Sequence, residues 1–399
     1  MPRQLYMDNA ATTAVLSEVL EAMTPYFTEF YGNPSSLYGL GVQAKDAITD
    51  ARERIAGHIN AKADEVYFTG SGSEADNWAV KATMEAYANK GRHMVTSAIE
   101  HHALINSAEW LEKNGYEVTF LPVNSDGLVS PDDLRAAMRD DTTLVSIIMA
   151  NNEIGSIQPI AELAAIAHEH GALFHTDAVQ ALAHLPIDVD ALGIDMLAAS
   201  GHKFHGPKGV GLLYLRKGLK TRSFIHGGAQ ERKRRAGTEN VPGIIGMAAA
   251  LDIAMPTLAE RSQYTQSLRD HLIDRVLSEV EHCRLNGHRT LRLPNNANFS
   301  FEFIEGESLL LMLEQKGIMA SSGSACASGS LDPSHVLLAI GLPHEIAHGS
   351  LRLTVGEDIT IEDIDYTVEN IKEVVVQLRQ MSPLYEDFLQ GKKPISAIR

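Results

Sequence analysis

The chain of 399 residues is long enough to bury a sizeable core, and its content of 44% hydrophobic and 21% charged residues excludes a disordered or fibrous protein. Its 51 acidic and 34 basic residues give a net charge of −17, which disfavours binding to nucleic acid or to anionic membranes. Two cysteines, Cys283 and Cys326, cannot build a disulfide framework, and no apolar run at the N-terminus resembles a signal peptide. We therefore expect a cytoplasmic protein that binds neither nucleic acid nor membrane.

Seven short apolar segments in the first part of the chain have the composition of buried β-strands. Segments of helical periodicity, such as "IAELAAIAHEHG", separate them. This alternation predicts an α/β fold with a mostly parallel sheet wrapped by helices. The strands are expected at residues 66–70, 93–99, 117–123, 143–150, 172–178, 195–200 and 210–216.

The pattern changes near residue 245. A long helical stretch that contains Pro256 leads to the apolar segments "NANFSFEF" and "SLRLTVG" and to an amphipathic helix over residues 361–380. This order predicts a smaller α+β domain that follows a helix kinked at the proline. We expect residues 16–250 to form the large domain, residues 251–399 the small one, and residues 1–15 to pack with the small domain.

Lys203 is the first candidate for chemistry, in the segment "SGHKFHGPKG" directly after a predicted strand. A lysine at a strand end beside small residues is placed to form a Schiff base with a flat cofactor. The alternative is a solvated surface lysine in a Gly/Pro turn. Lys208 lies deeper in the turn and is the weaker candidate.

Two further segments are typical of the same kind of site. Asp177 ends the predicted strand in "FHTDAVQ", where its carboxylate would keep a pyridine nitrogen protonated, although aspartate is also a common helix cap. In "TGSGSEADNW", Gly72 and Ser73 would offer N–H groups and a hydroxyl to a phosphate. A purely structural glycine turn is the alternative there.

Together with "YMDNAATT", "GNPSS", "AIEHHA", "NNEIG", "RRAGTEN", "SSGSAC" and "SLRLTVG", these segments resemble the NifS/IscS-type cysteine desulfurases. These are pyridoxal-phosphate enzymes of aminotransferase class V and fold type I. The motifs follow the family order from about residue 5 to about residue 356. The residues after Cys326 resemble the long-loop class. Ser73 and Tyr38 depart from the family pattern, where threonine and histidine are common, and neither change removes a catalytic group.

The resemblance implies a role for each matching residue. Lys203 would bond the cofactor, Asp177 would pair with its ring nitrogen, and Gln180 with its phenolic oxygen. His101 would stack on the ring and assist proton transfer, a role that suits a group titrating near neutrality. The full set of implied cofactor contacts is Gly72, Ser73, His101, Asn152, Asp177, Gln180, Ser200, His202, Lys203 and, from the second subunit of a homodimer, Thr238. Asn152 and Arg352 would also bind the substrate carboxylate.

Cys326, among serine, glycine and alanine in "SSGSACASG", would be the nucleophile that accepts sulfur. The implied reaction converts L-cysteine to L-alanine and leaves a persulfide on Cys326, which passes sulfur to an iron–sulfur scaffold or another acceptor protein. No resident metal is expected, although Cys326 would transiently ligate a cluster on a partner. The motifs fit general iron–sulfur assembly, nitrogenase maturation and tRNA thiolation equally. Cys283 is expected to be structural.

Three alternatives accompany this hypothesis, and one further segment has two interpretations. "HEIAH" at residues 344–348 matches a zinc-protease pattern but lies between Pro343 and Gly349, with no third ligand evident. Another pyridoxal-phosphate lyase or aminotransferase would need no thiol. A retired, non-catalytic scaffold would not need the intact catalytic set. The segment at residues 382–391 resembles one that docks scaffold proteins, and packing on its own domain is the alternative.

Overall fold

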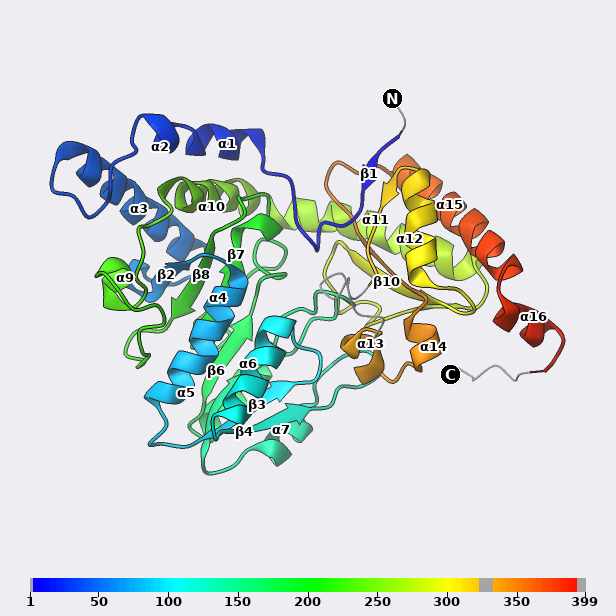
Figure 1. Ribbon diagram of the computed structural model, residues 1–399, viewed down its shortest axis with the longest axis horizontal. Helices are drawn as coiled ribbons and strands as arrows, with labels where there is room; N and C mark the ends of the chain where they lie inside the picture. Colours follow the sequence, from blue (N-terminus) through cyan, green and yellow to red (C-terminus); the bar gives the residue numbers. More distant parts are fainter. Residues whose placement is uncertain (1–2, 323–332, 393–399) are drawn as a thin grey trace.

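The computed structural model describes residues 3–322 and 333–392, so Cys326 lies outside the described residues. Figure 1 shows two lobes, and the larger one contains a seven-stranded sheet of order β2-β8-β7-β6-β5-β3-β4. Only β8 runs against its neighbours, so the prediction of a mostly parallel sheet is confirmed. Its strands are β2 (Val66–Thr69), β3 (His93–Ser97), β4 (Glu117–Leu121), β5 (Thr142–Ser146), β6 (Leu173–Asp177), β7 (Met196–Ser200) and β8 (Gly211–Leu215).

Helices cover both faces of this sheet. Neighbouring strand residues point to opposite faces. Accordingly, Val145 joins an apolar cluster with α3, α8 and α10, whereas Leu144 joins one with α4 and α6. The helices of this lobe are α1 (Ser17–Met23), α2 (Pro25–Thr28), α3 (Gly39–His58), α4 (Gly72–Asn77), α5 (Thr83–Ala86), α6 (His102–Lys113), α7 (Pro131–Ala137), α8 (Ile160–Glu169), α9 (Gln230–Lys233) and α10 (Val241–Ala254). Burial on both faces explains why β7 and β8 are almost entirely apolar and why the polar residues of β3 and β5 are buried histidine, threonine and serine.

The smaller lobe has an antiparallel sheet of order β12-β10-β9 with its own apolar cluster. Its strands are β9 (Cys283–Leu285), β10 (Asn296–Phe301) and β12 (Ser350–Thr354), and its helices are α11 (Leu258–Glu279), α12 (Gly306–Gln315), α13 (His335–Ala339), α14 (His344–Ala347), α15 (Ile361–Gln380) and α16 (Pro383–Leu389). Near the N-terminus, β1 (Leu5–Tyr6) pairs in parallel with β11 (Ile318–Met319). The N-terminal segment therefore contacts this lobe, while the expected domain boundaries stay a prediction.

The two lobes are linked where α10 meets α11. Pro256 lies between these helices, and their axes are bent by 76°. The kink predicted at this proline is a full break in the helix. Within the described parts of the chain, no single helix is long and apolar enough to cross a membrane; α10 and α11 satisfy that test only as this bent pair.

The C-terminal helix α16 turns its aromatic side chains onto its own lobe. The ring of Phe388 stacks on Phe303 with centroids 5.0 Å apart, and Tyr385 lies 5.5 Å from the same ring. Leu389 stays exposed. Of the two interpretations of this segment, the contacts of Tyr385 and Phe388 favour packing on the domain itself.

Candidate active site

The predicted site residues lie where several parallel strands end. The carboxyl ends of parallel strands share one edge of the sheet, where α/β proteins bind their ligands. Asp177 is the last residue of β6, and Ser200 is the last residue of β7. Gly72 follows β2, and His101 follows β3. The fold therefore brings to one edge residues that are more than a hundred positions apart.

Lys203 ends a short 3-10 turn, η3 (Gly201–Lys203), directly after β7. Its Nζ donates hydrogen bonds to the carbonyls of Ala10, at 2.6 Å, and Ala11, at 2.8 Å. Gln180 donates to the same Ala10 carbonyl at 2.8 Å. The N-terminal segment is thus part of the site, which the sequence motif alone did not indicate. Surface exposure, the alternative for Lys203, does not hold, because the amine is partly buried and hydrogen-bonded.

Asp177 is buried beside this lysine. Its Oδ1 accepts a hydrogen bond from the Val179 amide at 2.8 Å. Burial raises the pKa of Asp177 to about 6, while the Val179 N–H and the charge of Lys203 act in the opposite direction. The carboxylate is therefore held at the strand end with a nearby cation. No helix follows it directly, so it is not a helix cap.

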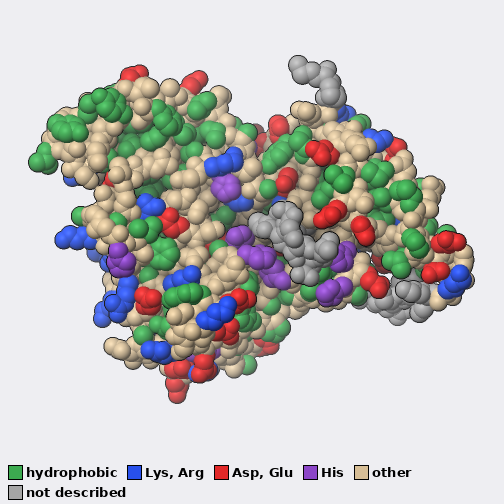
Figure 2. Space-filling model, viewed as in Figure 1, with side chains coloured by type: hydrophobic (Ala, Val, Ile, Leu, Met, Phe, Trp, Pro, Cys, Tyr) green, Lys and Arg blue, Asp and Glu red, His purple; other side chains and the backbone are tan. Residues whose placement is uncertain are grey.

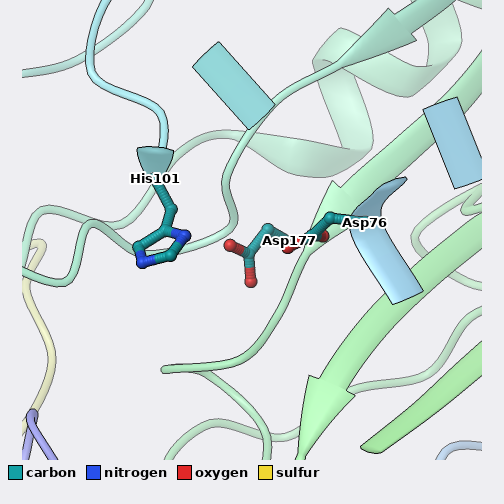
Figure 3. A group of neighbouring side chains, drawn as sticks. All are labelled: Asp76, His101 and Asp177. Carbon is teal, nitrogen blue, oxygen red and sulfur yellow. The ribbon is translucent and has the colours of Figure 1, made fainter. Parts of the chain in front are cut away.

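Figure 3 shows that the His101 ring faces Asp177 and that Asp76 lies behind Asp177. Ligand atoms of these three side chains all lie within 4.8 Å of one another. Two carboxylates and an imidazole are also donors that a metal ion accepts. The positive charge of Lys203 acts on both His101 and Asp177. The protein itself therefore places a cation near these carboxylates. Asp76 was not identified from the sequence.

His101 caps helix α6. Its Nδ1 accepts the Ala103 amide hydrogen at 3.1 Å, so the proton of the neutral ring lies on Nε2. Burial and the charges of Lys203, His102 and His335 lower the pKa of His101 to about 4. The expectation that this histidine titrates near neutrality is therefore wrong for the protein without ligand. In this form the ring can donate a proton at Nε2 and cannot accept one there.

The glycine-rich turn fits closely against β7. A Cβ atom on Gly72 would lie 2.6 Å from Val179 Cγ2 and 3.3 Å from Ser200 Cβ. Only glycine therefore lets the start of α4 approach the end of β7, and Gly72 and Ser200 become neighbours. Ser73 is exposed, and His202 Nδ1 lies 3.1 Å from Thr12 Oγ1. Burial, with Lys203 and Lys208 nearby, lowers the pKa of His202 to about 4.

Arg352 lies buried in β12, on the smaller lobe. Its Nη1 donates to the Asn152 carbonyl at 2.9 Å, and its Nη2 pairs with Asp8 Oδ1 at 2.8 Å. Its Nε is buried and has no hydrogen-bond partner within the described residues. Arg352 therefore forms a salt bridge and still keeps one buried donor atom for a ligand. The sequence did not indicate a role for Asp8 at the site, because its partner Arg352 is far away in the sequence.

Glu153, the neighbour of Asn152, joins the two lobes. Its Oε2 accepts a hydrogen bond from Ser334 Oγ at 2.5 Å, and Ser334 caps α13. Burial raises the pKa of Glu153 from 4.5 to about 7. The pair fastens the start of α13 to the loop that follows β5.

This shift predicts a pH-dependent stability. A buried acid with a raised pKa binds its proton more tightly in the folded chain, so the free energy of unfolding falls as pH rises from the unfolded pKa to the folded one. In the parent protein this carboxyl group lowers the free energy of unfolding between pH 4.5 and pH 8. Replacing Glu153 with glutamine should make that fall in unfolding free energy smaller by about 3 kcal/mol. Urea unfolding at both pH values would measure this. The exposed Glu112→Gln on α6 is the control, and an equal decline in all three proteins would contradict the prediction.

Some expected residues are not brought into this group. Thr238 is exposed on the loop before α10. Cys326 cannot be placed. Burial raises the pKa of Cys283 to about 11, which agrees with its structural interpretation. His344 begins the four-residue helix α14 and His348 follows its last residue; both are exposed, and neither belongs to a group of metal-ligating side chains among the described residues.

The donor types fit pyridoxal phosphate. Lys203 offers an amine for its aldehyde, Asp177 offers a carboxylate for its ring nitrogen, and Gly72 lets the glycine-rich turn lie beside Ser200, whose hydroxyl suits a phosphate. A mostly parallel seven-stranded sheet with this lysine and carboxylate at adjacent strand ends defines a pyridoxal-phosphate enzyme of fold type I.

Comparison with known proteins identifies the family. The model of the class-V aminotransferases matches residues 5–367. A cysteine desulfurase IscS of Methanosarcina thermophila is 57% identical over 96% of this chain and 94% of its own length. A solved NifS-like protein superposes with a TM-score of 0.88 at 37% identity, over 94% of this chain and 100% of that one. A second solved structure, described as SspA in complex with cysteine, has a TM-score of 0.79 at 36% identity over 88% and 99% of the two chains. The chain belongs to the class-V aminotransferase family, and its predicted resemblance to the NifS/IscS-type cysteine desulfurases is confirmed.

Proposed function

We propose that this protein is a cysteine desulfurase that converts L-cysteine to L-alanine, carries the sulfur on Cys326, and supplies it for iron–sulfur cluster assembly. The observation that carries the proposal is the partly buried, hydrogen-bonded amine of Lys203 near Asp177 at the carboxyl edge of the sheet. The names of the relatives support the reaction, and the complex of SspA with cysteine supports the substrate.

Each residue of the site has a role that its contacts support. Gly72, Ser73, Ser200 and His202 would hold the phosphate of the cofactor, while Asp177 and Gln180 would hold its ring. Bound pyridoxal phosphate supplies an electron sink for the electrons left when the substrate loses its α-proton. Because His101 has no free lone pair at Nε2, the amine of Lys203 is the better group to take that proton. His101 would instead donate a hydrogen bond.

Substrate orientation falls to Arg352 and Asn152. A guanidinium binds a carboxylate through two parallel hydrogen bonds. Arg352 has one buried Nε–H without a partner within the described residues, and its Nη2 is held by Asp8. The substrate carboxylate would take the Nε–H and displace or share the Asp8 contact. Asp8 keeps the guanidinium in place before substrate arrives.

The sulfur transfer balances without an added oxidant. The thiolate of Cys326 attacks the sulfur atom of the substrate, and the new S–S bond forms as the C–S bond breaks. The electron pair of that C–S bond stays on carbon, which then takes a proton to give alanine. Sulfur is thereby oxidised and carbon is reduced by the same two electrons. The persulfide passes its outer sulfur to an acceptor thiolate.

The test of this function is an assay of alanine and sulfide from L-cysteine in the presence of a reductant. We expect one sulfide for each alanine from the purified protein, and Cys326→Ala should lose nearly all of both. Cys283→Ala is the matched control and should behave as the parent protein. Equal sulfide release from the Cys326 variant would mean that another group accepts the sulfur.

We also propose that the protein is cytoplasmic, as its cysteine content suggests, and that two copies form a homodimer, as the sequence resemblance implies. Four large apolar side chains are exposed around the start of α3, and Figure 2 shows apolar side chains gathered over α1 to α3. They are Phe27 at 58% exposure, Tyr31 at 66%, Leu37 at 97% and Tyr38 at 62%. A patch of this kind favours burial against a second copy. Thr238 is exposed, as a residue that reaches a neighbouring subunit needs to be.

Sedimentation velocity would test the dimer. Leu37→Glu should shift the protein toward the monomer, because it places a charge within the apolar patch. Leu389→Glu, on exposed α16, is the control and should leave the mass unchanged. A monomeric parent protein, or an unchanged dimer in the Leu37 variant, would contradict this arrangement.

A further inference from the structure

Asp76 and His175 form a fully buried pair behind the candidate site. Asp76 lies on α4 with 1% of its surface exposed, and His175 lies on β6 with none. Asp76 Oδ1 and His175 Nε2 are 3.7 Å apart. Neither atom has a hydrogen-bond partner among the described residues. The other ring nitrogen of His175 lies 2.8 Å from Ser146 Oγ.

The pair lies next to Asp177. His175 and Asp177 are two residues apart on β6, so their side chains point to the same face of the sheet. An oxygen of Asp76 lies within 4.8 Å of an oxygen of Asp177 and a ring nitrogen of His101 (Figure 3). The charged and titratable groups that face this pair are Asp177, Glu100 and His101, with Lys203 beyond them.

Three buried carboxyl groups therefore share one apolar region. They cannot all be ionised there, because like charges in a medium of low dielectric repel strongly and each loses its hydration. The ionised form of Asp177 is stabilised by the Val179 N–H and by the nearby charge of Lys203. Glu100 accepts hydrogen bonds from Ser97 and Ile148 through Oε1, and its Oε2 has no partner within the described part of the chain. Asp76 Oδ1 has no such donor among the described residues.

We propose that Asp76 is a positioning residue that remains protonated beside a neutral His175, so that Asp177 is the one ionised carboxylate that faces the cofactor site. The inference rests on the proposed function in assigning Asp177 to the cofactor. At 3.7 Å, Asp76 Oδ1 and His175 Nε2 face each other without a hydrogen bond, and a small side-chain shift would let the hydroxyl of a protonated Asp76 donate to Nε2 of a neutral His175. The Nδ1–H of this neutral ring donates to Ser146. The pair then carries no net charge and leaves the negative charge of Asp177 to the ring nitrogen.

The titration behaviour of both groups agrees with this arrangement. Burial and the charges of Asp177 and Glu100 raise the pKa of Asp76 well above its ordinary value. Burial lowers the pKa of His175 to about 3. A neutral acid beside a neutral imidazole follows from both directions.

The first test needs no cofactor and no activity. Infrared difference spectra of the cofactor-free protein at pH 7.5 should show that Asp76→Asn loses a carbonyl band of a protonated carboxylic acid. The exposed Asp132→Asn should lose carboxylate bands only. Nitrogen NMR of the parent protein should show His175 as a neutral ring with its proton on Nδ1. Loss of carboxylate bands alone from Asp76→Asn, or a proton on Nε2, would overturn the proposal.

The second test measures the affinity for pyridoxal phosphate by fluorescence titration. Asparagine is neutral and keeps a donor, so Asp76→Asn should stay within about threefold of the parent dissociation constant, whereas Asp76→Ala, which leaves His175 without a donor, should be weaker by about tenfold. If Asp76 is ionised in the parent protein, both variants lose the same negative charge, and their affinities for pyridoxal phosphate should change by the same factor. That result would contradict the proposal. If the alanine variant does not fold, the infrared and NMR spectra of the parent protein and of Asp76→Asn still show whether Asp76 is protonated. An inactive protein that shows the acid band and binds the cofactor would refute the proposed function and leave this inference standing.

Discussion

Replacing Lys203 by alanine is expected to lower the rate of alanine formation from L-cysteine by about 10³-fold or more. The amine is both the bonding group for the cofactor and the better candidate for the base, because His101 offers no lone pair at Nε2. The initial rate of alanine release, measured at saturating pyridoxal phosphate, checks this. Exposed Lys208→Ala in the same turn is the control and should retain the parent rate.

The same variant separates two roles of the lysine. If Lys203 only binds the cofactor, adding a small primary amine to Lys203→Ala should restore little activity. Partial recovery with an added amine would show that it also moves a proton. Full activity of Lys203→Ala, or loss of activity in Lys208→Ala instead, would exclude the site described above.

Replacing Asp177 by asparagine is the second large effect. We expect a loss of about 10²-fold or more in kcat/KM, because a neutral amide cannot stabilise a proton on the ring nitrogen. Asparagine keeps the shape of the side chain and can still accept the Val179 amide hydrogen, so the turn should be preserved. The visible spectrum of the bound cofactor should change together with the rate.

Asp132→Asn on α7 is the matched control, since its carboxylate is exposed. Circular dichroism would establish that both variants are folded. A normal rate in folded Asp177→Asn would mean that this carboxylate does not pair with the ring, and that the charge comes from another group.

The sheet was predictable because β7 and β8 are nearly continuous apolar runs and the other strands combine apolar and β-branched residues in short segments between helical ones. Lys203 and Asp177 were predictable for a related reason. A polar residue directly after such a run lies at the edge where parallel strands end. The family motifs then assigned chemistry to both. Pro256 likewise marked the junction of α10 and α11, although the sequence indicated a kink and the structure has a break.

Asp76 and His175 were missed for physical reasons. An aspartate in "SEADNW" is typical of the first turns of an exposed helix, and it is buried because α4 packs between β7, β8 and α6. A histidine within a strand is usually a satisfied core residue. The buried carboxyl groups of Asp76, Glu100 and Asp177 come from three separate parts of the chain. Their proximity cannot be predicted from any spacing in the sequence.

Contacts between distant segments were equally out of reach. The Asp8–Arg352 pair and the Glu153–Ser334 hydrogen bond join residues 344 and 181 positions apart. Single motifs suggested a substrate role for Arg352, but its partner on the N-terminal segment appears only in the fold. The wrong expectation for the pKa of His101 has a related origin, since burial in the fold lowers it first and the charges of Lys203, His102 and His335 lower it further.

The most direct measurement is reduction of the protein with borohydride in the presence of pyridoxal phosphate, followed by peptide mapping of the labelled lysine. We predict that the label lies on Lys203 alone, at one per chain. A label on neighbouring Lys208 or another lysine, or no stable label at all, would contradict the assignment on which every role in this site depends.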